Sequence, residues 1–243
     1  MIKKHGKLIK KIVMIIIGGS LVMNVLGCKK QETKNNREWI ENRFDSIEKV
    51  YKTENLSDLF RKFPKGFIIR QTRLEKGLDS NSGYIYKLEL VGDSRKEEIT
   101  GTVKKVLTKG NPYRETTEKV SDVKYVNKEL KLVDSDMTAE LLPKKYFLFQ
   151  KIELNKNILK KMELEEKNYS SENGTYSIEY KMNNNEIVKY FNLSPGNSAT
   201  LRLSGYEGIE KKGYIQGIII REKHKGIDYS EEVLEVEGKG YGE

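Results

Sequence analysis

The sequence predicts an α+β fold built mainly from antiparallel β-sheet, with an N-terminal helical segment and one or two short helices between two groups of strands. Residues 84–90 and 176–182 alternate apolar and polar side chains with the period of a half-buried strand. The strand-like segments follow one another at short intervals, which favours antiparallel pairing because parallel strands need long crossovers. Few segments carry helical spacing, so sheet should dominate the fold.

Composition excludes several classes of protein. The chain has 243 residues, a formal net charge of +9, one cysteine and two histidines. A single cysteine excludes a disulfide-stapled scaffold and is too few for a thiolate zinc site. The apolar content of 37% is low for a globular protein, but 14 Tyr and 7 Phe supply bulky side chains for a core. The length allows one or two domains.

The N-terminus has the layout of a bacterial lipoprotein signal. Five lysines and no acidic residue precede an apolar segment that is shorter than the roughly 20 residues needed to span a bilayer. Residues 1–27 are therefore predicted to be a secretory signal peptide. The segment Val25-Leu26-Gly27-Cys28 resembles a lipobox, the motif at which a lipid is added and the signal peptide is cleaved.

The lipobox gives each of its residues a chemical role. The Cys28 thiol is the nucleophile that takes up a diacylglyceryl group, and the small Gly27 lets a peptidase cut between Gly27 and Cys28. Val25 and Leu26 complete the motif with aliphatic side chains. Two acyl chains suffice for stable attachment, so we expect Cys28 to hold the protein at the extracellular face of the cell membrane. The alternative is an uncleaved anchor whose only cysteine happens to fall at its end.

Domain boundaries follow from this cleavage site. Residues 28–38 are predicted to be the lipidated cysteine and a flexible tether, because the polar run after Cys28 cannot bury enough apolar surface to order itself. The α+β domain then comprises residues 39–243, with a division into two sub-units near residues 135–155 left open. Removal of residues 1–27 takes away five lysines, so the net charge falls from +9 to +4.

Two helical segments are predicted to begin the domain. The apolar residues of the first recur at helical spacing: Ile40, Phe44, Ile47 and Tyr51. The second segment is expected to start after Asn55, which can cap it, and to stop at Pro64. Its apolar stripe contains Leu56, Leu59, Phe60 and Phe63. Both stripes are expected to pack against a sheet.

Strands dominate the rest of the chain. In residues 84–90 the apolar side chains alternate with Lys87 and Glu89, as expected for a sheet with one buried face. Residues 120–126 and 130–133 flank Asn127-Lys128-Glu129 and are predicted to form a hairpin. A looser repeat consists of Ile99, Val103 and Leu107.

The second half of the chain is predicted to alternate strands with short helices. An apolar run at residues 144–149 leads into a helix at 155–162, and residues 183–185 can cap a short helix after strand 176–182. The segment 214–220 is apolar on both faces, so it should be a central strand. The remaining predictions are a turn at 195–197, a strand with Leu201 and Leu203, and a last strand marked by Leu234 and Val236.

Several of these segments resemble the staphylococcal tandem lipoprotein family. Besides the lipobox and the polar tether, the similar segments are KVYKTENLSDLF at 49–60, DVKYVNKELKLVD at 122–134, YSIEYKMNNNEIVKY at 176–190, and residues 205–220. The resemblance implies a surface-exposed membrane lipoprotein that acts in host-cell interaction, or in innate immune stimulation through its lipidated N-terminus. It implies no enzymatic activity.

The sequence singles out no catalytic residue, metal site or cofactor. Of the two histidines only His224 remains after processing, and its polar neighbours favour a solvated turn over a catalytic triad, which needs a buried orienting partner. No spacing distinguishes a pair of carboxylates. Neither a metal motif nor a glycine-rich phosphate loop is found.

Four pairs of adjacent lysines raise the question of a polyanionic partner. They are Lys104-Lys105, Lys144-Lys145, Lys160-Lys161 and Lys211-Lys212. Adjacent strand residues point to opposite faces, so a pair does not by itself form a patch. Aromatic residues do not interleave with these lysines as a nucleic-acid platform would require, so we expect no nucleic-acid partner.

These observations leave three functions. The leading one is a non-enzymatic, lipid-anchored interaction module that presents its domain to a host or envelope protein. The second is a small-ligand-binding lipoprotein serving uptake, which would show a deep pocket with convergent polar groups. The third is a cell-envelope hydrolase, which requires a perturbed pair of carboxylates in a cleft. The oligomeric state is left open.

Overall fold

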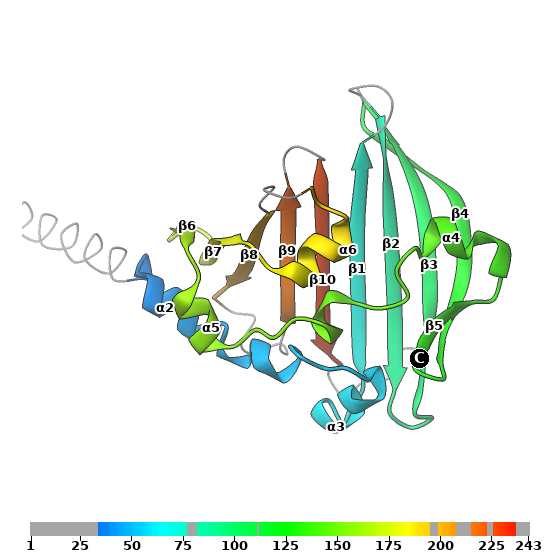
Figure 1. Ribbon diagram of the computed structural model, residues 1–243, viewed down its shortest axis with the longest axis horizontal. Coiled ribbons are helices and arrows are strands. Elements are labelled where there is room, and N and C mark those ends of the chain that lie inside the picture. The colour runs from blue at the N-terminus through cyan, green and yellow to red at the C-terminus, as the bar shows by residue number, and fades with distance from the viewer. Residues whose placement is uncertain are drawn as a thin grey trace, which may run out of the picture.

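One continuous antiparallel sheet forms the body of the molecule (Figure 1). The computed structural model describes residues 34–76, 82–110, 112–194, 199–207, 215–222 and 226–236. Within these ranges ten strands pair in the order β5-β4-β3-β2-β1-β10-β9-β8-β7-β6. Together with a few short helices, this sheet confirms the predicted α+β class with mainly antiparallel pairing.

The strand order divides the sheet into two meanders that meet at its centre. Strands β1 to β5 form the first and β6 to β10 the second, and β1 pairs with β10, with Ile69 opposite Val233. The strands are β1 (Phe67–Lys76), β2 (Ser82–Asp93), β3 (Glu98–Lys109), β4 (Arg114–Val126), β5 (Glu129–Leu132), β6 (Leu164–Tyr169), β7 (Thr175–Met182), β8 (Ala199–Tyr206), β9 (Ile215–Glu222) and β10 (Ile227–Glu235).

The short helices lie against one face of this sheet, which we call the covered face (Figure 1). The α-helices are α2 (Arg37–Asn42), α3 (Leu59–Lys62), α4 (Thr138–Leu141), α5 (Lys156–Lys161) and α6 (Asn185–Phe191). In the described ranges four 3₁₀ turns accompany them: η1 (Asp45–Lys49), η2 (Leu56–Asp58), η3 (Ser135–Met137) and η4 (Leu148–Gln150). The opposite, uncovered face carries the polar residues of the alternating strands, such as Lys87 and Glu89 on β2.

The core lies between the covered face and the helices. Alternate residues of each strand supply it, as Leu88 and Leu90 do on β2, because successive side chains of a strand point to opposite faces. A single buried cluster includes residues of both meanders. The segment near residues 135–155, where a division was left open, belongs to the connection that crosses from β5 to β6. Its residues Phe147 and Phe149 are buried in the shared core.

Several local predictions are confirmed because they depend on side chains close in sequence. Asn55 and Asn184 cap η2 and α6, each with its side-chain oxygen accepting a backbone N–H. The helix predicted at 155–162 is α5. The hairpin predicted around residue 128 is the β4–β5 hairpin. The helix expected to begin the domain is split into α2 and η1.

Residues 34–38, which the prediction places in the tether, have specific partners in the structure. Lys34 forms an ion pair with Glu207 at 2.5 Å, and Lys167 donates a 2.6 Å hydrogen bond to the carbonyl oxygen of Asn35. Asn36 caps α2. These partners are distant in sequence, so a local lack of hydrophobic residues did not reveal them. Residues 1–33 lie outside the described ranges, as do the turn at 195–197 and the start of the segment 214–220.

Candidate functional site

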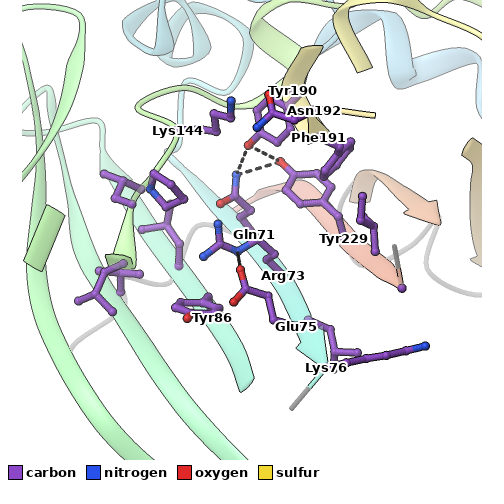
Figure 2. Close-up of a pocket in the computed structure, with 18 residues that line it drawn as sticks. Gln71, Arg73, Glu75, Lys76, Tyr86, Lys144, Tyr190, Phe191, Asn192 and Tyr229 are labelled. Carbon is purple, nitrogen blue, oxygen red and sulfur yellow. Dashed lines mark hydrogen bonds and ion pairs between the residues drawn. The ribbon is translucent and has the colours of Figure 1, made fainter. Parts of the chain in front are cut away.

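A pocket of about 440 Å³ opens on the covered face beside the centre of the sheet (Figure 2). Strands β1, β2, β3 and β10 form its floor, α6 forms one wall, and residues 141–144 of the connection form another. Helix α6 ends at Phe191 and is followed by Asn192, which adopts the left-handed conformation with φ of 50° and turns the chain away. The apolar lining consists of Leu74, Leu88, Val103, Leu141, Leu142, Pro143, Phe191 and Ile227.

Strand β1 carries the polar side chains of the pocket. Its first covered-face residues, Phe67 and Ile69, are fully buried in the core. The same alternation then directs Gln71, Arg73 and Glu75 into the pocket. The covered face of β1 therefore contributes to the core at its start and to the pocket at its end. Its side chains change from apolar to polar at the point where the helices no longer cover the strand.

Arg73 is the main charge inside the pocket. Its guanidinium carbon lies 4.2 Å from the centre of the Tyr86 ring, a cation–π contact, and its Nε is 3.3 Å from Oε1 of Glu75. Its Nη2 makes a long 3.5 Å contact with the carbonyl oxygen of Glu140. Since a guanidinium has five N–H donors, these contacts leave donors for a further acceptor.

Two tyrosines and a glutamine form the polar end of the pocket (Figure 2). The Gln71 amide donates to the hydroxyl oxygens of Tyr229 at 2.9 Å and Tyr190 at 3.3 Å. The Tyr190 hydroxyl in turn donates to the carbonyl oxygen of Tyr146 at 3.3 Å. Burial raises the pKa of Tyr190 and of Tyr229 above the ordinary value, so both hydroxyls stay protonated. The polar atoms of Gln71, Tyr190 and Tyr229 are therefore used largely in hydrogen bonds within the protein.

A buried carboxylate, Glu231, lies behind this polar end. It accepts hydrogen bonds from the hydroxyls of Tyr229 at 2.6 Å and Tyr51 at 3.0 Å. The backbone N–H groups of Leu148 and Phe149 each donate at 2.8 Å. Burial raises the pKa of Glu231 to about 7, and the four donors oppose that rise. Glu231 thus ties the connection and the N-terminal segment to β10.

The sequence analysis identified none of these residues as a site. It marked the last strand by Leu234 and Val236, whereas Tyr229, Glu231 and Val233 take the covered face. The available signal was Glu231 itself, an acidic residue at an alternate position of the last strand between the apolar Tyr229 and Val233. It would have suggested a buried carboxylate, although its donors could not be read from the sequence.

Two of the four lysine pairs are divided between different surroundings, whereas Lys160 and Lys161 are both exposed at the end of α5. Lys105 points to the covered face and pairs with Glu140 at 2.8 Å, while Lys104 is exposed on the opposite face, as predicted for adjacent strand residues. Lys144 lines the pocket with its Nζ 5.8 Å from the Tyr190 ring, and among the described residues no carboxylate lies within ion-pair distance of it. Its neighbour Lys145 is exposed.

The predicted lipidation and cleavage residues, Val25, Leu26, Gly27 and Cys28, lie outside the described ranges, as does His224. In the part of the chain that is described, no helix is long and apolar enough to cross a membrane. The same part shows no group of three His, Cys, Asp or Glu residues placed to hold a metal ion.

No protein-family model matches this chain, and no curated protein matches its sequence. The resemblance to the staphylococcal tandem lipoproteins therefore stays a prediction from short motifs. The pocket and the N-terminal signal are the two features on which a functional proposal can rest.

Proposed function

We propose that this protein is a lipid-anchored lipoprotein of the bacterial cell surface whose folded domain is a non-enzymatic module that binds a small ligand. The observation that carries the proposal is the pocket on the covered face, where Arg73 and the polar end converge over an apolar floor. Concave sites with an apolar lining and a few oriented polar groups are typical of small-ligand binding.

The anchor follows from the sequence of the N-terminus. A diacylglyceryl group on Cys28 supplies the attachment to the membrane. The polar residues that follow Cys28 are proposed to act as a tether between the lipid and the folded domain. On this proposal the domain is held close to the outer surface of the membrane.

Binding to a host or envelope protein, and immune stimulation by the lipidated N-terminus, rest on the family resemblance. Several charged residues on the uncovered face pair with one another, as Arg70 does with Glu89 at 2.7 Å and Arg221 with Asp228 at 3.7 Å. Such mutual pairing leaves no strong field of one sign for a charged partner. The pocket therefore supports a small ligand better than any described surface supports a protein.

The arrangement of carboxyl groups does not favour a hydrolase. Among the described carboxyl groups, Glu231 is the one whose pKa is raised, but it does not line the pocket and is enclosed by four donors. Glu75 does line the pocket and pairs with Arg73. A hydrolase of the type considered needs two carboxylates facing one substrate. Glu231 is better placed for a structural role.

Native mass spectrometry of residues 29–243, after incubation with small-molecule extracts of the envelope and of the growth medium, tests the proposal. The buried core extends from Ile40 to Val233, so this shorter chain keeps all of it. We expect a saturable adduct of one small molecule per chain. Hydrogen exchange should slow in residues 138–144 and 185–192 and stay unchanged in 114–132. Absence of any adduct, or protection confined to 114–132, would overturn the proposal.

A further inference from the structure

We propose that the pocket is selective for organic monoanions with an apolar body, such as amphipathic carboxylic acids. The acid group pairs with Arg73, and the hydrocarbon or aromatic body lies on the apolar floor. This inference rests on the proposed function, because it assigns a chemical class to the ligand of the same pocket.

The charge of the lining favours an anion. Two cations, Arg73 and Lys144, face the pocket against one carboxylate, Glu75, whereas Lys76 at its edge follows Glu75 on β1 and points away from it (Figure 2). Lys144 is partly buried. Lys76 is exposed, where water and salt screen its charge. Arg73 is more enclosed, with 24% of its side chain exposed, so its charge acts at closer range. A neutral ligand would leave the excess positive charge of the lining uncompensated, and a cationic ligand would be repelled.

The position of Arg73 suits it to an acid group. The guanidinium is held at 4.2 Å over the Tyr86 ring, which fixes its plane without using its N–H donors. Glu75 meets the Nε edge at 3.3 Å, and the contact of Nη2 with Glu140 is long. A planar carboxylate matches the remaining donors of a guanidinium, and such charge-assisted pairs are stronger than neutral ones.

The other polar groups do not compete for this role. Gln71, Tyr190 and Tyr229 are joined to one another, and Tyr229 also donates to Glu231. They therefore form a closed end to the pocket, which leaves Arg73 as the main group available to the ligand, with Lys144 as a second cation on the wall.

The apolar part of the lining sets the second half of the specificity. Leu88 and Val103 on the floor and Leu141 and Phe191 on the walls offer hydrocarbon and aromatic surface. Burial of each further methylene of a ligand should raise its affinity up to about fourfold. In a series of straight-chain carboxylates, affinity should rise with chain length until the cavity of about 440 Å³ is filled.

Two fluorescent dyes with the same ring system separate charge from apolar contact. Anilinonaphthalene sulfonate carries an acid group, and N-phenyl-naphthylamine is uncharged. In titrations of residues 29–243 we expect the anionic dye to bind about tenfold more tightly than the uncharged one. Arg73→Gln should weaken the anionic dye by about tenfold and the uncharged dye by less than about twofold.

Matched variants place the effect in the pocket. Arg70→Gln changes an arginine of the same strand on the uncovered face and should leave both dyes unchanged. Glu75→Gln removes the carboxylate that competes for Arg73 and should tighten the anionic dye alone. This variant keeps the inference testable if Arg73→Gln fails to fold, which circular dichroism will show. Lys144→Gln should weaken the anionic dye slightly, and Lys145→Gln should have no effect.

Displacement then tests the natural chemistry. Decanoate should displace the anionic dye from the wild-type chain, whereas decanol and decylamine at the same concentration should not. Equal affinity for both dyes, or equal displacement by decanol, would overturn the anion selectivity while leaving a ligand pocket in place. If neither dye nor decanoate binds, the proposed selectivity for anions is overturned. If native mass spectrometry also finds no adduct from the extracts, the proposed function fails as well.

Discussion

The hydroxyl of Tyr229 donates a 2.6 Å hydrogen bond to the buried carboxylate of Glu231, two residues farther along β10. Tyr229 also lines the pocket, whereas Glu231 is held by Tyr51 and by two backbone N–H groups of the connection. The wall of the pocket and the packing of the connection on the sheet are therefore parts of one hydrogen-bond network.

The stability of the domain should fall as the pH rises from about 5 to about 8. Burial raises the pKa of Glu231 to about 7 in the folded protein, against 4.5 for an ordinary glutamate. Between these values the folded state holds a proton that the unfolded state has released, so stabilisation present at low pH is lost as the pH passes through 7. The loss should be roughly 3 kcal/mol in the free energy of unfolding, measured with urea.

Two variants on β10 separate Glu231 from other titrating groups. Glu231→Gln is neutral at every pH and should lose most of this pH dependence. Glu232→Gln changes the next residue, which faces the opposite side and is partly exposed, and it should keep the wild-type dependence. If the free energy of unfolding depends on pH in the same way in Glu231→Gln and in the wild type, other groups cause that dependence.

Tyr51→Phe should destabilise the domain more at high pH than at low pH. The variant removes one donor from Glu231, and hydrogen bonds to an ionised carboxylate are stronger than those to a neutral acid. We expect a loss of about 2 kcal/mol in the free energy of unfolding at about pH 8, and a smaller loss at about pH 5. Tyr51 does not line the pocket, so dye binding should be unchanged. Equal losses at both pH values would contradict this role.

Lys128→Gly should stabilise the β4–β5 hairpin. Val126 pairs with Glu129, so Asn127 and Lys128 form a two-residue turn, and both have positive φ, 55° and 63°. Glycine adopts this conformation without the steric cost of a Cβ, which predicts a gain of about 0.5–1 kcal/mol in thermal or urea unfolding. Lys131→Gly, within β5, should destabilise instead. A lower stability of Lys128→Gly would contradict the turn geometry.

Cys28→Ala should abolish lipid attachment, because alanine has no thiol to accept the diacylglyceryl group. We expect the protein either to be released from the membrane or to keep residues 1–27, which membrane fractionation and intact-mass measurement distinguish. Lys128→Gly serves as a control with an intact lipobox. Unchanged membrane retention together with unchanged mass would show that Cys28 is not the anchor.

Local patterns were sufficient wherever the cause of a structure lies within a few residues. The strand at 176–182 and the helix cap at Asn184 were predicted because alternation and capping depend on neighbouring side chains. The contacts of residues 34–38 could not be predicted from the local sequence, because Lys34 pairs with Glu207, which lies 173 residues away. For the same reason the environment of Glu231 was not predicted, because three of its four donors come from two distant segments.

The sequence by itself determined the antiparallel character of the sheet and predicted the lipid anchor at Cys28, because both depend on patterns of residues that are neighbours in the chain. Only the tertiary structure decided that a pocket exists and that Arg73 stands in it. The pairing of β1 with β10 brings Gln71 beside Tyr229. The connection between β5 and β6 crosses the sheet, and its residues 141–144 form one wall of the pocket. The physical reason is that alternation follows from local backbone geometry, whereas the covering of a strand depends on contacts between segments far apart in the chain.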